Sequence, residues 1–460
     1  MEIFDVVVIG AGPGGYPAAI RAAQLGASVA IVEKEQLGGT CLNWGCIPTK
    51  ALIAAADTFA RIQHAEAFGV TVKGASVDYG VMIGHKNKVV TQLKGGIKQL
   101  LAANRVKKFT GVASFKDRNT LAISDGTVIG AKKIIVATGS TSAMPGFLPK
   151  HERVVESRRF LDIDQLPASM IILGGGIIGC ELACMTAMLG VKVTIVELLD
   201  DILLVLDADV RREVRGHMEK HLGIRVLAGK ALEKITADAK GVRGNFGDEV
   251  LKADLLLSAI GRIPVTEGLN LENAGLKTNE RGFIEADDYC RTNVATIFAI
   301  GDVTGKIQLA HFATAQGIVA AENAISQKPH RHDKLVPNVI FTSPEVGTVG
   351  LSEDDVKKQK LAVKVGKYRF AGLGKALASG EATGFVKWIA DAATDQLLGA
   401  VAVGPHATEL IAEAATAIRS ELTVRELGRT IHAHPTFSEA WMEAAHAVHG
   451  ECIHAPPQRK

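Results

Sequence analysis

The sequence has few cysteines, nearly balanced charge and no long block of charge of one sign. Six cysteines in 460 residues do not form a disulfide scaffold, so a disulfide here is more typical of catalysis than of structure. The net charge is only +3, and no run of like charge resembles a tail that binds nucleic acid or a membrane surface. Functions of those two classes are therefore not expected.

Targeting and membrane segments are lacking too. The opening residues MEIFDVVVIG have no basic region before the apolar run, and they predict a strand rather than a secretory signal. The nearly apolar segment 170–188 contains three successive glycines and Glu181, which predict a glycine-rich turn rather than a membrane span. We expect a cytoplasmic protein of two to four domains, because 460 residues exceed what a single core accommodates.

The chain instead contains two copies of a strand, glycine turn, helix and strand pattern. Both copies have G-x-G-x-x-G spacing, a glycine that ends the helix and an acid that ends the second strand, at a constant offset of 164: Gly10, Gly12, Gly15, Gly26 and Glu33, then Gly174, Gly176, Gly179, Gly190 and Glu197. Such glycines bring a helix N-terminus to a pyrophosphate, and the acid accepts hydrogen bonds from a ribose. The repeat predicts an α/β protein with two dinucleotide sites.

The second site favours NAD over NADP. Glu197 would accept from a free 2′-hydroxyl and repel a 2′-phosphate, and residues 198–201 contain no arginine to receive that phosphate. Arg211, Arg212 and Arg215 follow on a predicted surface helix, where we expect them to be solvated. At the first site, spacing alone is compatible with NAD or FAD.

Cys41 and Cys46 lie just beyond the first unit, in GGTCLNWGCIPTK. A zinc site needs about four ligands, which the surrounding sequence does not supply. A structural disulfide that closes so short a loop would stabilise the fold only slightly. A redox pair fits better than inert thiols. Because a disulfide and a nicotinamide are normally coupled through a flavin, this pair assigns FAD to the first site and NAD to the second. Cys180 and Cys184, on the helix of the second unit, are expected to be packing residues.

The C-terminal segment 431–441 supplies a candidate base. His432 and His434 flank Ala433 before a proline, and Glu439 follows. Imidazole titrates near neutral pH and can deprotonate a thiol, which must ionise before it attacks a disulfide. A carboxylate could fix the tautomer of such a histidine and hold its orientation.

Six motifs occur in order along the chain: GGTCLNWGCIPTK at 38–50, ATGS at 137–140, GR-x-P at 261–264, AIGD at 299–302, LAH at 309–311 and HAHPTFSE at 432–439. Together they resemble the pyridine-nucleotide disulfide oxidoreductases, and most strongly the dihydrolipoamide dehydrogenases of 2-oxo acid dehydrogenase complexes. The resemblance implies two Rossmann-like dinucleotide-binding domains and a C-terminal α+β dimerisation domain. The implied boundaries are 1–148 for FAD binding, 149–269 for NAD binding, 270–337 for a central domain completing the FAD site, and 338–460 for the dimer interface.

The resemblance also implies roles for individual residues. Cys41 would exchange with the substrate, Cys46 would face the flavin as a thiolate, and Lys50 would lie near the flavin and pair with Glu181. The further implied contacts to FAD are Gly10, Gly12, Gly15, Glu33, Lys34, Gly39, Thr40, Ala113, Thr138, Gly139, Asp302, Leu309, Ala310 and His311. Those implied for NAD are Gly174, Gly176, Gly179, Glu197, Gly261 and Arg262, and no metal is implied.

By the same resemblance, His434 is the base and Glu439 its orienting partner, and both act on the disulfide of the other subunit of a homodimer. The bond between His434 and Pro435 is expected to be cis. The implied reaction oxidises dihydrolipoyl groups and reduces NAD. The partners would be a lipoyl domain and core acyltransferase of a 2-oxo acid dehydrogenase complex, or a glycine cleavage carrier.

Rival disulfide reductases fit less well. Glutathione reductase would carry phosphate-binding arginines after the second acid, and mercuric or large thioredoxin reductases would add a second redox pair near the C-terminus. A cofactor-binding scaffold with inert cysteines is the rival from another class.

Some residues depart from the family pattern. Pro17 lies inside the first nucleotide helix, where an early-turn proline should be tolerated. Val265 stands where the family often has Asn, which puts the polar contacts of that loop in doubt. The tail residues His446, His449, Cys452 and His454 are expected to form a solvated helix end rather than a metal site.

Overall fold

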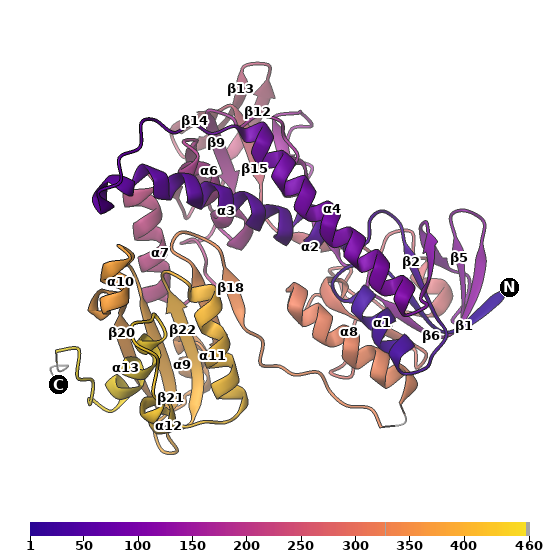
Figure 1. Cartoon of the computed structure of the whole chain (residues 1–460). Helices are drawn as coiled ribbons and strands as arrows, with labels where there is room; N and C mark the ends of the chain where they lie inside the picture. Colours follow the sequence, from indigo (N-terminus) through magenta and orange to yellow (C-terminus); the bar gives the residue numbers. More distant parts are fainter. Residues whose placement is uncertain (327, 457–460) are drawn as a thin grey trace.

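The first unit is built on a largely parallel sheet. The structure, a computed structural model, describes residues 1–326 and 328–456 (Figure 1). The strand order is β3-β2-β1-β6-β5-β4, and β17 pairs with β6, so a strand from much later in the chain joins the first sheet. The strands are β1 (Glu2–Ile9), β2 (Val29–Glu33), β3 (Lys107–Thr110), β4 (Ala113–Phe115), β5 (Thr120–Ile123), β6 (Val128–Val136) and β17 (Ile297–Ala299). The helices α1 (Gly15–Gln24) and α8 (Ala310–Ile325) pack against each other and against this sheet.

The second unit repeats the architecture with an all-parallel sheet of order β11-β10-β9-β15-β8. Its strands are β8 (Val154–Glu156), β9 (Ser169–Leu173), β10 (Lys192–Val196), β11 (Arg225–Leu227) and β15 (Leu255–Ser258), and its helices are α5 (Ser157–Phe160), α6 (Ile177–Met188) and α7 (Ala208–His221). An antiparallel sheet of β12 (Glu233–Asp238), β13 (Gly241–Phe246) and β14 (Glu249–Ala253) is inserted before β15, and β7 (Ser140–Ser142) pairs with β16 (Arg262–Pro264).

The repeat predicted from the glycines extends to the strand register. Val6 lies opposite Val29 in the first sheet, and Met170 lies opposite Val193 in the second, each 164 positions later. The first glycine of each turn has a left-handed backbone, with φ of 99° at Gly10 and 103° at Gly174. The segment that resembled a membrane span is β9, the turn and α6. Within residues 1–326 and 328–456, no helix is long and apolar enough to cross a membrane.

The C-terminal part is an antiparallel sheet of order β18-β19-β22-β21-β20 with helices around it. Its elements are β18 (Asn338–Ile340), β19 (Val346–Gly350), α9 (Glu353–Gln359), β20 (Val363–Arg369), α10 (Gly374–Ala378), β21 (Phe385–Asp391), β22 (Leu397–Val403), α11 (Ala407–Arg419), α12 (Val424–Arg429) and α13 (Glu439–Val448). Trp388 of β21 packs on Trp441 of α13 with ring centroids 4.5 Å apart, and its indole N–H donates to the Trp441 carbonyl at 3.0 Å. This α+β part confirms the predicted fold class.

Two long helices connect the first two units, as Figure 1 shows. These are α3 (Cys46–Gln63) and α4 (Tyr79–Ala103), preceded by the short α2 (Gly39–Trp44). The buried side chains Leu52, Ile53 and Ala56 of α3 belong to the core of the second unit. The helix that begins at Cys46 is therefore fixed by the second unit as well as by the first. The part of the chain that the structure describes also contains the short 3-10 helices η1 (Ala65–Phe68), η2 (Leu271–Ala274), η3 (Gly301–Thr304) and η4 (Phe370–Gly372).

Candidate active site

Cys41 and Cys46 lie on two successive helices that Gly45 separates. Cys41 is in α2, and Cys46 is the first residue of α3, where no side chain caps the helix. A side chain at Gly45 would press on the Thr40 carbonyl oxygen at 2.9 Å, so only glycine fits the tight break that places the second cysteine at a helix N-terminus. That position favours a thiolate, because the helix dipole and free amides stabilise negative charge.

The two thiols are electrostatically different. A hydrogen bond from Cys41 and the charge of Lys50 lower the pKa of Cys46 to about 7, against the opposing effects of burial and Glu181. The same hydrogen bond, together with burial, raises the pKa of Cys41 well above its ordinary value. In the reduced pair Cys46 is therefore the thiolate and Cys41 the thiol that donates to it. Both cysteines are free in this structure.

Lys50 and Glu181 form the expected ion pair. The Lys50 ammonium lies 2.7 Å from the Glu181 carboxylate, whose side chain is only 6% exposed. The other Glu181 oxygen accepts from the backbone N–H of Phe341 at 2.9 Å, and the lysine nitrogen lies 4.6 Å from the centroid of the Phe341 ring. This small network joins α3, α6 and the end of β18, and it satisfies an acid buried in an apolar helix.

The glycines of both turns fall into two groups. Side chains on Gly10 and Gly15 would collide with backbone atoms of the turn or its neighbouring strand, so the fold itself requires these glycines. A Cβ on Gly12 would meet only Gly39 at 3.9 Å, and one on Gly176 would meet nothing within 4 Å. Packing does not require these middle glycines, but a close backbone approach to a phosphate does.

The acids at the ends of β2 and β10 make equivalent contacts. Glu33 accepts from the Ala11 amide at 2.7 Å, and Glu197 accepts from the Gly175 amide at 2.6 Å. Each carboxylate is thus fixed against its own glycine turn, next to the helix N-terminus. No side chain caps α1 or α6, and neither helix has an acid in its first turn, so their amides are available to an anion.

The arginines of α7 contradict part of the sequence analysis. Arg212 is exposed, as expected, but Arg211 and Arg215 are not simply solvated. Both form ion pairs with Asp201, at 3.3 Å and 2.9 Å. Asp201 belongs to the loop directly after Glu197, so two of the three arginines of this helix are paired with an acid of the second unit. The sequence LLDD at 198–201 gave no indication that Asp201 pairs with arginines ten and fourteen positions later.

Around the first site, Ser140 links two candidate residues. Its hydroxyl donates to Asp302 at 2.5 Å and accepts from Arg262 at 2.7 Å. Thr138 donates its hydroxyl to the Val265 carbonyl at 2.7 Å, and the Val265 amide donates to the Gly139 carbonyl at 3.0 Å. Position 265 therefore contributes its backbone carbonyl and amide, and not its side chain, to these contacts. This explains how valine is accommodated there.

Pro17 is the third residue of α1, as expected for a tolerated proline. Its missing amide would otherwise donate to the Pro13 carbonyl, which instead accepts from the Thr314 hydroxyl of α8 at 2.8 Å. Leu309, Ala310 and His311 form the N-terminus of the same helix, and the His311 ring contacts the Pro337 carbonyl at 2.7 Å.

His434 and Glu439 are paired on the C-terminal part. Nδ1 of His434 lies 2.9 Å from one Glu439 oxygen, and the other oxygen accepts from the Thr436 amide at 2.8 Å. Burial opposes ionisation of this carboxyl, but the two hydrogen bonds prevail and lower the pKa of Glu439. The bond between His434 and Pro435 is cis, as expected. The His434 side chain is 77% exposed, which leaves the ring accessible.

The neighbouring histidine is engaged elsewhere. Nε2 of His432 lies 2.7 Å from a Glu413 oxygen, and its Nδ1 lies 2.9 Å from the Thr430 carbonyl. The hydrogen bond to Glu413 raises the pKa of His432. Within one chain, α12 and α13, the two helices that precede and follow the His434 segment, lie well apart from α2 (Figure 1).

Comparison with known proteins decides the family. The sequence profile of pyridine nucleotide-disulphide oxidoreductases matches residues 4–317, and the profile of their dimerisation domain matches residues 336–445. The chain belongs to the pyridine nucleotide-disulphide oxidoreductase family. It is thus a flavoprotein disulfide oxidoreductase, and its dimerisation domain implies a homodimer.

Full-length relatives agree with this assignment. Dihydrolipoyl dehydrogenase of Chlamydia muridarum is 44% identical over 100% of both chains. Dihydrolipoyl dehydrogenase of Bacillus subtilis is 41% identical over 98% of this chain and 99% of its own. Among solved structures, LpdA of Mycobacterium tuberculosis has a TM-score of 0.90 at 26% identity, covering 97% of this chain and 99% of LpdA. The HOCl-induced flavoprotein disulfide reductase RclA of Escherichia coli has a TM-score of 0.88 at 29% identity, covering 97% and 99%.

The C-terminal tail departs from the expected solvated helix end. Cys452 donates to the buried Glu443 at 3.0 Å, and Nδ1 of His454 lies 2.6 Å from the other oxygen of that carboxylate. His449 lies 3.0 Å from Asp395, with only 15% of its side chain exposed. The tail is packed onto α13 through a buried acid that sequence periodicity did not single out.

Proposed function

We propose that this disulfide oxidoreductase is a dihydrolipoyl dehydrogenase, which oxidises protein-bound dihydrolipoyl groups and reduces NAD. The observation that carries the proposal is the asymmetric pair Cys41 and Cys46, with the thiolate at a helix N-terminus beside Lys50. Full-length identity of 41–44% to dihydrolipoyl dehydrogenases supports the substrate.

We assign FAD to the first glycine turn and NAD to the second. The uncapped helix N-termini and the open space at Gly12 and Gly176 suit a pyrophosphate in each case. Bound FAD would accept the electron pair from the cysteine side and deliver it, as hydride, to NAD. Lys34, Gly39, Thr40, Ala113, Thr138, Gly139, Asp302 and the α8 N-terminus are proposed to hold FAD. Gly261 and Arg262 are proposed to border the nicotinamide.

NAD is favoured over NADP because acids dominate the second site. Glu197 is fixed at the turn, and Asp201 pairs with Arg211 and Arg215. A 2′-phosphate would meet the negative charge of Glu197, and the guanidinium groups of Arg211 and Arg215 are already paired with an acid. We also propose the boundaries 1–148, 149–269, 270–337 and 338–460 for the four functional domains.

The chain's own residues account for the thiol chemistry. His434 of one subunit takes a proton from a substrate thiol, and the thiolate attacks the sulfur of Cys41 in the Cys41–Cys46 disulfide of the other subunit. Cys46 leaves as a thiolate. The second substrate thiol then displaces Cys41, which leaves protonated, and the substrate departs as a cyclic disulfide. Glu439 holds the His434 ring and stabilises its positive charge.

A direct test compares substrates. The FAD-loaded protein is expected to oxidise dihydrolipoamide with NAD, to show little activity when NADP replaces NAD, and to reduce glutathione disulfide only slowly with NADPH. Faster reduction of glutathione disulfide by NADPH than oxidation of dihydrolipoamide by NAD would contradict the proposal and favour a glutathione-type reductase. The physiological partner would be a lipoyl domain and core acyltransferase of a 2-oxo acid dehydrogenase complex, or a glycine cleavage carrier.

A further inference from the structure

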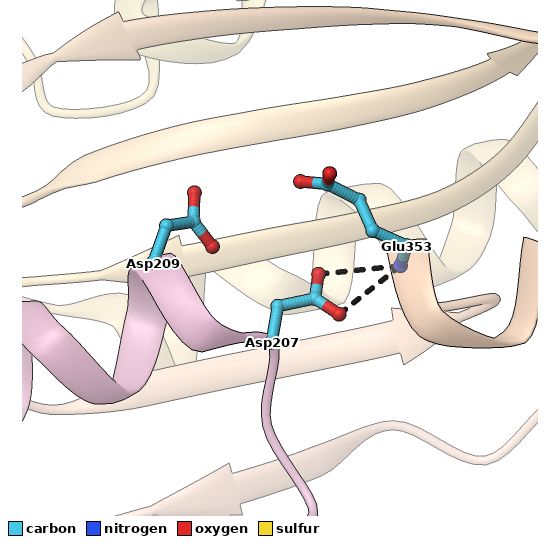
Figure 2. A group of neighbouring side chains, drawn as sticks. All are labelled: Asp207, Asp209 and Glu353. Carbon is cyan, nitrogen blue, oxygen red and sulfur yellow. Dashed lines mark hydrogen bonds between the residues drawn. The ribbon is translucent and has the colours of Figure 1, made fainter. Parts of the chain in front are cut away.

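A buried lysine lies among three carboxylates far along the chain from the cysteine pair. Figure 2 shows Asp207, Asp209 and Glu353. One carboxylate oxygen from each of them lies within 4.8 Å of those of the other two. The ammonium of Lys387, a residue of β21 that is 1% exposed, lies 2.9 Å, 3.0 Å and 2.6 Å from them. This spacing would suit a metal ion, but the lysine supplies the positive charge.

The cluster joins the second nucleotide unit to the dimerisation domain. Asp207 precedes α7 and Asp209 lies in its first turn, whereas Glu353 begins α9 and Lys387 is in the C-terminal sheet. The Glu353 amide also donates to Asp207 at 3.1 Å. Lys367 of β20 binds Asp209 at 2.8 Å. Two buried or half-buried lysines from one domain thus hold the start of α7 in the other.

Asp207 is also the end of the loop that follows Glu197. Within this loop the Leu206 amide donates to the Leu203 carbonyl at 2.9 Å, and the Leu203 amide donates to the Gly175 carbonyl at 2.8 Å. Leu203 is buried with φ of 52°, a left-handed conformation that surrounding structure must maintain in a leucine. Lys387 is therefore connected to the Gly175 turn, where Glu197 is bound, through Asp207, its chain neighbour Leu206 and the two hydrogen bonds of Leu203.

We propose that Lys387 is a positioning residue for the pyridine nucleotide: by holding Asp207, it fixes loop 198–207 and the Gly175–Glu197 turn. The inference rests on the proposed function in placing NAD at the second unit. Without the ammonium, three carboxylates face one another while Lys367 pairs with Asp209 and Asp207 keeps the Glu353 amide, so Asp207 loses its cationic partner Lys387 and must move or be protonated. Either change releases the end of the loop.

The test is Lys387→Met in the FAD-loaded protein, with Lys86→Met as matched control. Lys86 is 2% exposed and binds the Leu161 carbonyl and Asp162, each at 2.8 Å, so it too is a buried lysine that holds the second unit. Its contacts lie outside the loop after Glu197. Nucleotide affinity is measured as KM for NAD and, independently of turnover, as the Kd for NADH by titration. Thermal unfolding is recorded for both variants.

Lys387→Met is expected to raise KM for NAD and Kd for NADH about tenfold, since small misplacements of a binding site have effects of this order or larger. The rate of flavin reduction by dihydrolipoamide should stay within about twofold, and Lys86→Met should leave the nucleotide constants unchanged. If Lys387→Met does not fold, Asp207→Asn takes its place: it weakens the same contact from the other side and is expected to raise the same constants about threefold.

Unchanged nucleotide constants in Lys387→Met, or in Asp207→Asn where Lys387→Met does not fold, would overturn the inference. So would an equal rise in Lys86→Met, because that would indicate a general loss of stability. If wild-type protein failed to oxidise dihydrolipoamide, the proposed function would be wrong, but the NADH titrations would still test the role of Lys387.

Discussion

Replacing Lys50 with methionine is predicted to raise the pKa of Cys46. The pKa of this thiol is lowered from 9.0 to about 7, with the Cys41 hydrogen bond as the largest cause and the Lys50 charge the next to act in that direction. The shift corresponds to roughly 1–2 kcal/mol at 1.36 kcal/mol per pKa unit, after allowance for the solvent that screens the exposed Cys46. Loss of the lysine charge is expected to return about one unit of it. At pH 7 the thiolate fraction would fall from about one half to about one tenth.

The assay is the pH dependence of alkylation of the reduced protein by iodoacetamide, with peptide mapping of Cys46. Glu181→Gln is the control of opposite sign, because the Glu181 charge raises the pKa of Cys46. Alkylation should shift to higher pH in Lys50→Met and to lower pH in Glu181→Gln. The electrostatic explanation fails if both variants shift in the same direction, or if Lys50→Met does not shift at all.

Three further predictions follow from the geometry. His434→Gln is expected to lower kcat for dihydrolipoamide by ~10²–10⁴, whereas His432→Gln should change it little; equal losses would show that neither ring is specifically the base. Thr314→Val removes the hydroxyl that donates to the Pro13 carbonyl and should lower the free energy of unfolding by about 1 kcal/mol, measured by urea denaturation. Adding Pro17→Ala should reduce this loss, because the amide restored at position 17 can donate to the same carbonyl. If the effects of the two substitutions on the free energy of unfolding were simply additive, this explanation would be contradicted. Burial, and then the charge of a neighbouring histidine, lower the pKa of His217 from 6.5 to about 4, so its contribution to stability is complete above pH 6.5 and is lost as the pH falls towards 4. Between pH 6.5 and pH 4 the free energy of unfolding of His217→Gln should therefore fall by roughly 1–2 kcal/mol less than that of the wild type, after allowance for solvent screening. Identical pH profiles of stability would show that His217 does not have this lowered pKa.

Local sequence signals predicted the two nucleotide units well. Their glycines have backbone requirements that few other residues meet, and the constant offset of 164 holds from Gly10 and Gly174 to the strand register. The pairing of Lys50 with Glu181, which are 131 positions apart, came from the family resemblance and is present in the structure. No local pattern connects two such distant residues.

Other contacts were outside the reach of sequence reasoning. Phe341 binds Glu181 through its backbone amide, a contact that does not depend on the type of side chain at position 341 and so cannot be read from the sequence. The pairing of Asp201 with two arginines corrected the expectation of solvated side chains, because helical periodicity places a residue on a face but does not identify its partner. Lys387 lies in a strand whose alternation gives no sign that a lysine is buried among carboxylates from another domain.

The central claim is that Cys41 and Cys46 form the disulfide that the dithiol substrate reduces. The most direct measurement is anaerobic addition of one equivalent of dihydrolipoamide per subunit to the oxidised, FAD-loaded protein, followed by the visible spectrum and by alkylation mapping. The account predicts that both cysteines become alkylatable and that a long-wavelength thiolate–flavin band appears, which Cys46→Ser abolishes. A band that persists in Cys46→Ser, or cysteines that dihydrolipoamide leaves unchanged, would contradict it.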